Sequence, residues 1–213
     1  MRIEESPADS AFITKFYENL PLRVLEDEET LWVMGEICEG FVTYAARRIM
    51  SWAEDSNIAS IPVLICSRGG VLDDALAVYS LLRYFPKYKR AFVFHASSAA
   101  VFLALACDER IGFPETTILL HDLSMEFSGK GEHFKQELEG IERYQRILTD
   151  IIVTRTKIPE ELWLERRDKE WYMNATEALH WGILTSIENR EEVPRPRKSS
   201  SKRKKKVEKA ASA

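Results

Sequence analysis

A serine in the middle of this sequence has the position that nucleophilic catalysis needs. Ser98 follows a run of apolar residues typical of a buried strand and lies in the small-residue run SSAAVFLALA. A serine at such a strand-to-helix junction faces the free N–H groups of the helix start, which favour a developing negative charge. Serine is also a common helix N-cap, so Ser98 taken alone is either a nucleophile or a cap.

Two further features add to this chemistry. His121 follows the apolar residues 118–120, and a histidine at the end of a buried strand can act as a general base near neutral pH, although it can equally be a half-buried structural side chain. Gly69 and Gly70 follow another apolar run. Paired glycines let the backbone approach a ligand and offer N–H donors to an oxyanion, but they also occur between strand and helix for geometric reasons alone.

The elements that must position these residues alternate along the chain. Apolar runs predict strands, and apolar spacings of three and four predict helices. The predicted strands cover 30–34, 61–66, 91–94, 110–113 and 117–120, with a turn at 67–70, and the predicted helices cover 39–55, 72–84 and 98–106. Strands separated by helices favour right-handed crossovers and a mostly parallel sheet covered on both faces.

The pattern changes after residue 121. Residues 123–131 are polar, and residues 132–157 have the spacing of one long helix with a single apolar stripe. A long helix with such a stripe, projecting from a compact domain, usually has a partner, and self-association is the simplest one. A last helix that stops at Gly182 and a final strand are predicted within residues 175–187.

Length and composition fit one globular domain. The chain has 213 residues, of which 45% are hydrophobic and 30% charged. No apolar run reaches the roughly 18 to 20 residues of a membrane-spanning helix, and the acidic N-terminus does not resemble a signal peptide, so we expect a cytoplasmic protein. The three cysteines lie singly in apolar runs, at positions 38, 66 and 107, and we expect them to be buried thiols rather than disulfides or metal ligands.

The C-terminal tail differs in charge from the rest of the chain. From Val193 onward there are nine Lys and Arg residues against one acid, within a net charge of −4 for the whole chain. The tail has almost no large apolar residues, so we expect residues 191–213 to be disordered. It either keeps the protein soluble or attaches it to nucleic acid or another acidic surface, without base recognition.

Three segments carry a resemblance to a known family. The segments VLICSRGGVLDDALAVY, FHASSAAVFLALACDERIGFPETTILLHD and RRDKEWYMNATEALHWGILTSI resemble the signature regions of the Clp protease proteolytic subunit, and the second resembles Clp-like proteases of bacteriophages even more. The resemblance runs from about residue 31 to residue 187. It implies an α/β fold of the Clp-protease/crotonase type, a spiral of repeated β-β-α units with a mostly parallel sheet and a protruding handle helix. The implied domains are an N-terminal arm at 1–30, a peptidase domain at 31–190 and the basic tail at 191–213.

The resemblance also assigns roles to residues. Ser98 falls on the nucleophile and His121 on the base that takes its proton. The third member of the family's triad is an aspartate, and Glu170 falls on its position, with Asp168 as the runner-up. Either carboxylate can hold the imidazole in the right tautomer, but glutamate reaches about one methylene further. No metal or organic cofactor is implied.

The oxyanion hole of the family falls on the N–H groups of Gly70 and Ala99. Two further positions depart from the family's pattern, because Arg68 stands where the family usually has proline and Phe94 where it usually has glycine. A bulky side chain at Phe94 could narrow the substrate channel. Ser97, next to Ser98, is an alternative hydroxyl, although the strand-to-helix register favours Ser98.

The resemblance implies a serine-type endopeptidase that cleaves polypeptides as the proteolytic subunit of an oligomeric ring. Energy dependence would then come from a partner AAA+ ATPase unfoldase, since the sequence has no GxxxxGK[ST] phosphate loop. The alternatives are a Clp-like subunit that no longer cleaves and has a structural role in a mixed ring, and a phage head-maturation protease. A crotonase-type acyl-CoA enzyme shares the backbone plan but requires neither the serine nor the histidine.

Overall fold

The computed structural model describes residues 30–53, 58–123 and 131–188, with residues 131–137 described by their backbone alone. The predicted N-terminal arm at 1–30, apart from Thr30, and the predicted basic tail at 191–213 lie outside the described residues. The same holds for most of the polar segment that precedes the long helix.

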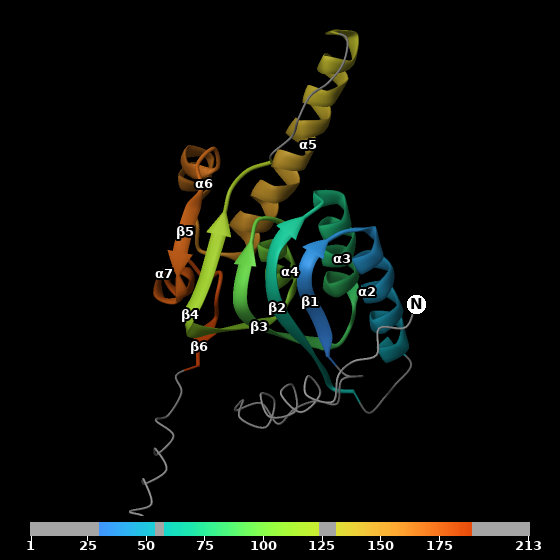
Figure 1. Cartoon of the computed structure of the whole chain (residues 1–213). Coiled ribbons are helices and arrows are strands. Elements are labelled where there is room, and N and C mark those ends of the chain that lie inside the picture. The colour runs from blue at the N-terminus through green and yellow to red at the C-terminus, as the bar shows by residue number, and fades with distance from the viewer. Residues whose placement is uncertain (1–29, 54–57, 124–130, 189–213) are drawn as a thin grey trace, which may run out of the picture.

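The centre of the described chain is a six-stranded sheet (Figure 1). Its strand order is β1-β2-β3-β4-β5, with β6 also paired to β4. Strands β1 to β4 are parallel to their neighbours, β5 is antiparallel to β4, and β6 is parallel to β4. The strands are β1 (Leu31–Ile37), β2 (Ser60–Gly70), β3 (Tyr88–Ser97), β4 (Glu109–Leu120), β5 (Trp171–Asn174) and β6 (Ser186–Ile187). The predicted mostly parallel sheet is therefore confirmed.

Helices α2, α3 and α4 lie behind the sheet in the view of Figure 1, and no described helix lies in front of it. The helices are α2 (Glu39–Ala53), α3 (Leu72–Tyr84), α4 (Ala99–Ala106), α5 (Gly131–Arg155), α6 (Glu160–Arg166) and α7 (Ala175–His180). The described helices thus cover one face of the sheet, whereas cover on both faces was expected. Strands β1 to β4 follow one another in sheet order, and right-handed crossovers that always advance in one direction place their helices on the same face.

The hydrophobic core fills the space between the sheet and these helices. Alternate strand residues such as Leu31, Val33, Ile61 and Val63 are buried in it, as the period of two in a strand requires. All eight residues of α4 are buried, because its sequence AAVFLALA has no polar face to turn toward water. The predicted buried helix is confirmed, and it begins immediately after Ser98.

Three local assignments from the sequence differ from the structure. The predicted turn at 67–70 is the end of β2. The two predicted strands at 110–113 and 117–120 form the single strand β4, whose register shifts against β3 between Val93 and His95. The exposed residues Pro114 and Glu115 lie in this irregular stretch, and Pro in a strand resembles a turn signal. Helix α6 and strand β5 were not predicted, since seven and four residues are too short to show a period.

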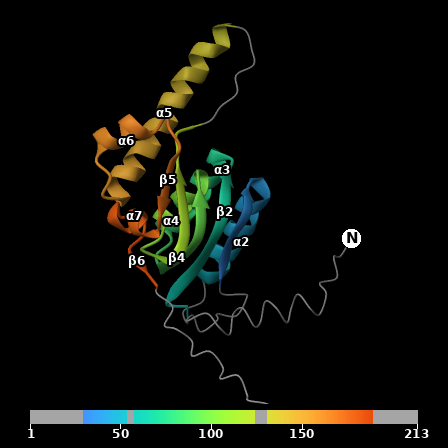
Figure 2. The ribbon, with the colours of Figure 1, turned by 60° about the vertical axis from the view of Figure 1, so that its left-hand side comes forward.

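Helix α5 extends well beyond the sheet at its N-terminal end (Figures 1 and 2). Its C-terminal half belongs to the core through Leu148, Ile151 and Ile152, whereas Leu138 and Ile147 are 41% and 43% exposed. The predicted long helix is confirmed, and part of its apolar stripe is open to solvent. No helix among the described residues is long and apolar enough to cross a membrane.

The cysteines do not all behave as the sequence suggested. Cys107 is buried, but Cys38 and Cys66 are exposed, and all three are free thiols. The expectation of three buried thiols is wrong for two of them. Cys38 lies in the connection between β1 and α2, and the side chain of Cys66 projects from the sheet face that no described helix covers.

Candidate active site

Ser98 occupies a strained elbow between β3 and α4. Its φ of 55° and ψ of −128° make it the one residue other than glycine with a positive φ in the described ranges. Such backbone conformations cost about 1–3 kcal/mol and persist only where the surroundings impose them. Here the Ser98 N–H donates to the carbonyl of Leu119 at 2.8 Å, and the Val101 N–H donates to the Ser98 carbonyl at 3.0 Å.

The hydroxyl of Ser98 does not cap α4. No hydrogen bond joins this side chain to the N–H groups at the start of the helix, so the alternative role of a capping serine is not realised. The side chain is half-buried. Ser98 therefore combines a constrained backbone with a hydroxyl that the helix does not use.

Of the paired glycines at the end of β2, Gly69 packs directly against this elbow and Gly70 packs against β1. Gly69 has a φ of +97°, and a Cβ on it would lie 2.7 Å from the Ser97 carbonyl oxygen, 2.9 Å from the Ser98 Cβ and 3.0 Å from the Ala99 nitrogen. Gly70 is equally close to the backbone of Ile37, whose carbonyl oxygen would lie 2.2 Å from an added Cβ. Only glycine fits this approach. The structure thus brings Gly69, the elbow serine and the first N–H of α4 together.

His121 lies at the corresponding end of the neighbouring strand. Ser97 pairs with Leu119 in the parallel register of β3 and β4, so Ser98 and His121 leave the sheet at the same edge, where sites of parallel sheets form. No hydrogen bond joins the two side chains within the described residues. Instead His121 Nδ1 lies 2.5 Å from the carbonyl oxygen of Asp122. Because a carbonyl only accepts, Nδ1 carries the proton and Nε2 remains the basic nitrogen, which is the tautomer a general base needs.

The position of Glu170 relative to His121 follows from strand register. In the antiparallel pair, Leu119 lies opposite Tyr172 and Leu120 opposite Trp171, so the register continued by one residue places Glu170 opposite His121. Directly opposed side chains have Cβ atoms about 4.5–5.5 Å apart. The Glu170 carboxylate nevertheless accepts a hydrogen bond from the Tyr172 hydroxyl at 2.9 Å, and among the described residues it makes none to His121.

Asp168, the runner-up, is exposed. The same register carried three residues past Leu120 and Trp171 places Asp168 opposite Leu123 rather than His121. The ladder does not continue regularly that far, because the Asp122 N–H donates to the Arg167 carbonyl at 2.7 Å. The register favours Glu170 over Asp168 as the acid nearest to His121.

Asp122 is a site residue that the sequence did not single out. Its carboxylate accepts hydrogen bonds from the Leu123 N–H at 2.8 Å and the Gln145 side chain at 2.7 Å, and it lies 3.6 Å from Arg167 Nε. The Asp122 side chain is only 9% exposed. It joins the segment after β4 to α5 and to the end of α6, and this fixes the carbonyl that orients His121. The one signal in the sequence that could have identified Asp122 is that it directly follows His121, the candidate base.

Ser97 is a hydroxyl with a different partner. It bonds to His95 Nε2 at 3.0 Å, and His95 Nδ1 bonds to the Thr117 hydroxyl at 2.7 Å. Burial, and after it the positive charge of Arg68, lower the pKa of His95 from its usual value, so this imidazole is a weak base. Ser97 is 6% exposed. A substrate reaches Ser98 more readily than Ser97.

Among the described residues, no ring contact or hydrogen bond joins the Phe94 side chain to the elbow at Ser98. It lies in the irregular part of β3, and its ring stacks on Phe113 with the centroids 4.6 Å apart. The stacking holds the ring against β4. That Phe94 narrows the substrate channel stays a prediction. No group of three or more His, Cys, Asp or Glu residues within the described ranges is arranged to hold a metal ion.

The comparisons with known proteins place this chain in a family. A profile of the Clp protease family matches residues 17–191. An ATP-dependent Clp protease proteolytic subunit of Dehalococcoides mccartyi is 31% identical over 167 residues, which are 77% of this chain and 84% of that protein. The ATP-dependent Clp protease proteolytic subunit 2 of Treponema denticola is 24% identical over 164 residues, or 75% of this chain and 82% of that protein.

The fold is shared with a solved structure of the same kind. A ClpP1 mutant from Listeria monocytogenes superposes with a TM-score of 0.68 and 18% sequence identity, covering 78% of this chain and 94% of that chain. The match of the family profile covers all of the described residues and extends beyond them at both ends. The chain belongs to the Clp protease family.

Proposed function

We propose that the protein is a serine endopeptidase in which Ser98 is the nucleophile and His121 the general base. The observation that carries this proposal is the elbow at Ser98, which has a positive φ, no capping bond and Gly69 packed against it. A nucleophilic serine needs N–H donors beside it that stabilise the oxyanion, and the start of a helix supplies such donors. Membership of the Clp protease family supports a peptidase.

In the proposed reaction the Ser98 oxygen bonds to the carbonyl carbon of the scissile peptide while His121 Nε2 takes its proton. The N–H groups of Gly70 and Ala99 are the proposed donors to the oxyanion, and the contact of Gly69, next to Gly70, with Ser98 and the Ala99 nitrogen supports this. The C–N bond then breaks as His121 returns the proton to the leaving amine. Water, deprotonated by His121, hydrolyses the acyl-enzyme.

Glu170 is the proposed third member, since the register places it opposite His121. To stabilise the imidazolium, its carboxylate must turn from the Tyr172 hydroxyl toward His121. The Asp122 carbonyl already selects the tautomer. Glu170 is therefore needed for charge rather than for orientation.

A fluorophosphonate probe tests the nucleophile, with Ser97→Ala as the matched control. We expect the wild type and Ser97→Ala to be labelled and Ser98→Ala to lose both labelling and peptide hydrolysis, since residual activity without the nucleophile is about 10³- to 10⁴-fold above water at most. Labelling that survives in Ser98→Ala would refute the assignment. Circular dichroism and sedimentation of the three proteins show whether the fold and assembly are retained.

We further propose that the protein acts as a subunit of an oligomeric ring that receives polypeptides from a partner AAA+ ATPase. The relatives are ATP-dependent Clp protease proteolytic subunits, and this likeness and the open apolar side chains of α5 support the assembly. Sedimentation velocity at micromolar concentration tests it, and a stable monomer would argue against it. A role in phage head maturation and a cytoplasmic location stay predictions.

Two observations favour a second candidate, a structural subunit that no longer cleaves. Among the described residues Ser98 and His121 share no hydrogen bond, and the Glu170 carboxylate is engaged by Tyr172. The two candidates differ in the labelling experiment: a structural subunit would assemble with active subunits but leave the probe unreacted at Ser98.

A further inference from the structure

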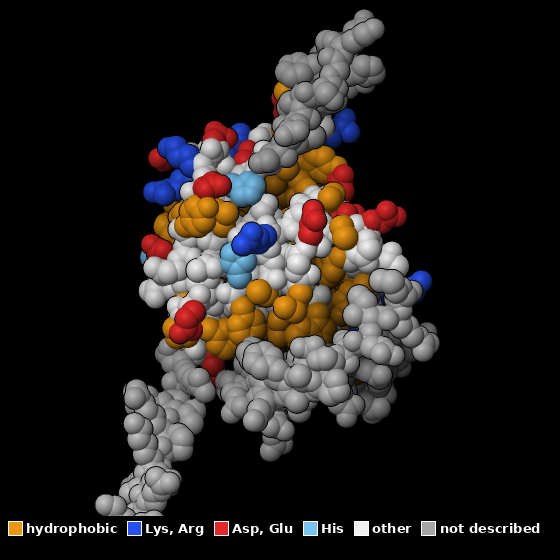
Figure 3. Space-filling model, in the orientation of Figure 1, with side chains coloured by type: hydrophobic (Ala, Val, Ile, Leu, Met, Phe, Trp, Pro, Cys, Tyr) orange, Lys and Arg blue, Asp and Glu red, His pale blue; other side chains and the backbone are white. Residues whose placement is uncertain are grey.

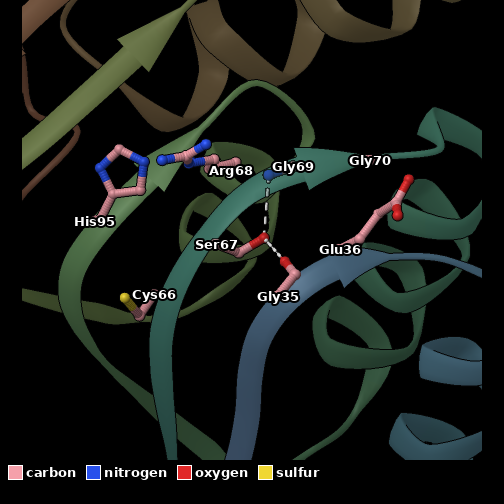
Figure 4. A pocket seen from close by; sticks show the side chains of 8 residues that line it. All are labelled: Gly35, Glu36, Cys66, Ser67, Arg68, Gly69, Gly70 and His95. Atoms are coloured by element: carbon pink, nitrogen blue, oxygen red, sulfur yellow. Dashed lines mark hydrogen bonds between the residues drawn. The ribbon is translucent and has the colours of Figure 1, made fainter.

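An open pocket of about 790 Å³ lies next to the elbow, at the ends of β1, β2 and β3. Cys66, Arg68 and His95 are at one end of it, and Glu36 is at the other (Figure 4). Gly69 also lines the pocket, and it is the residue packed against Ser98. A group bound here would therefore lie close to a peptide held at Ser98.

The two ends of the pocket carry opposite charges. The side chain of Arg68 projects toward His95, while Glu36 lies on the far side of β2 (Figure 4). Arg68 is exposed and makes no hydrogen bond or ion pair with another residue in the described part of the chain. Figure 3 shows that histidine and cationic side chains come to the surface together on the open face of the sheet. The Arg68 end therefore offers a guanidinium without an internal counter-ion.

His95 is held in place and does not add a second charge. One ring nitrogen bonds to Ser97 and the other to Thr117, so both polar atoms of the ring are already in use. Burial and the charge of Arg68 lower the pKa of His95, which keeps the ring neutral at neutral pH. His95 forms a wall of the pocket, and Arg68 provides its positive charge.

We propose that the Arg68 end of this pocket is a subsite for a carboxylate of the peptide substrate, which is either an Asp or Glu side chain or a terminal carboxylate. The proposal rests on the proposed peptidase function. A guanidinium presents parallel N–H donors that match the two oxygens of a carboxylate. The pocket volume is within the roughly 300–1,000 Å³ usual for ligand pockets. The Arg68 side chain is exposed beside His95, so a carboxylate can reach its guanidinium.

Peptide hydrolysis gives the first test. Fluorogenic peptides are prepared that differ only by Glu or Gln at each position flanking the cleaved bond, each with a free or an amidated C-terminus. We expect the best carboxylate-bearing peptide to have a kcat/KM about fivefold above its neutral partner, as solvent-screened pairs allow. Arg68→Gln should remove this ratio, and Arg47→Gln, an exposed arginine on α2, should keep it.

The pattern of substrates separates the two sources of the carboxylate. A preference for Glu over Gln that survives amidation indicates a side-chain carboxylate. A preference for the free over the amidated C-terminus, with either side chain, indicates the terminal carboxylate. A wild type without any preference, or a ratio unchanged in Arg68→Gln, would overturn the subsite.

A second test does not need peptidase activity and so remains decisive if the proposed function fails. Cys66 is an exposed thiol at the Arg68 end, and Cys38 is an exposed thiol outside the pocket. Both displace iodide from iodoacetate, an anion, and from iodoacetamide, which is neutral. At Cys66 we measure the rate with iodoacetate divided by the rate with iodoacetamide. We expect this ratio to fall about fivefold in Arg68→Gln, and to fall with added salt in the wild type. The ratio at Cys38 should stay constant. An equal ratio at Cys66 in wild type and Arg68→Gln would show that Arg68 does not attract carboxylates.

Discussion

Gly69 lies so close to Ser98 that a methyl group on Gly69 would stand 2.9 Å from the Ser98 Cβ. The contact joins the end of β2 to the start of α4 and defines the elbow. It also involves the Ala99 nitrogen and the Ser97 carbonyl, which belong to backbone and cannot move aside cheaply. The proposed site therefore depends on a residue that has no side chain.

Gly69→Ala should abolish peptide hydrolysis and probe labelling, because the added carbon would push the elbow out of place. Gly35→Ala is the matched control, since Gly35 also has a positive φ, +76°, but nothing lies within 4 Å of its added Cβ. The control should bear only the backbone strain, about 1 kcal/mol. Labelling rates and thermal unfolding measure the two effects, and equal activities in the two variants would contradict this account of the elbow.

Glu170→Gln should lower kcat by at least about tenfold, because it removes the charge that stabilises the imidazolium while leaving the Asp122 carbonyl to hold His121. Asp168→Asn is the comparison, and we expect it to keep near wild-type activity. Steady-state kinetics with one peptide suffices. If neither variant loses activity, the backbone carbonyl alone supports the base; if only Asp168→Asn loses it, the assignment passes to Asp168.

The three cysteines should react in two classes. Burial raises the pKa of Cys107 to about 12, so its thiolate is scarce at any ordinary pH. A thiol-disulfide reagent at pH 8 should titrate Cys38 and Cys66 within minutes and Cys107 only after unfolding. Three fast thiols in the native protein would mean that α4 does not end in the core as described.

Arg110 should be important for stability. Its guanidinium is buried and donates to the carbonyls of Ile183, Cys107 and Gly182 at 2.7–3.0 Å. Arg110→Met removes the donor to the Ile183 and Gly182 carbonyls, while the Cys107 carbonyl keeps its hydrogen bond from Arg155. We expect a loss of about 3–5 kcal/mol in the free energy of unfolding. Chemical denaturation measures it. Arg90→Met is the control, because the exposed pair of Arg90 and Glu109 should contribute no more than about 1 kcal/mol.

His95 should make the fold less stable in mild acid. Its folded pKa lies below the usual 6.5, so as the pH falls through 6.5 the unfolded chain binds a proton before the native protein does. The Tm should therefore fall more between pH 7.5 and 5.5 in the wild type than in His95→Gln. In NMR titrations Arg68→Gln should raise the pKa of His95, since the variant removes the positive charge that helps to lower this pKa. A rise in stability on acidification that depends on His95 would contradict the sign.

The sequence was enough to locate the main parts of this fold. Helix α3 begins and ends where its apolar spacing predicted, at Leu72 and Tyr84. Helix α4 was predictable because a run of eight small and apolar residues can only be buried. Local period and composition decide such elements. They failed for β4, where Pro114 resembles a turn, and for β5, whose four residues are held by pairing with β4 rather than by any pattern of their own.

The residues that can do chemistry were also identifiable from the sequence, but their relationships were not. Types and order pointed to Ser98, His121 and the glycine pair. Only the tertiary structure decided that Ser98 has a positive φ, that Gly69 touches it, and that the Asp122 carbonyl selects the tautomer of His121. It also decided that register, not sequence distance, brings Glu170 opposite His121. These are contacts between strands far apart in the chain, and they follow from how the strands pair, which no local pattern of residues encodes.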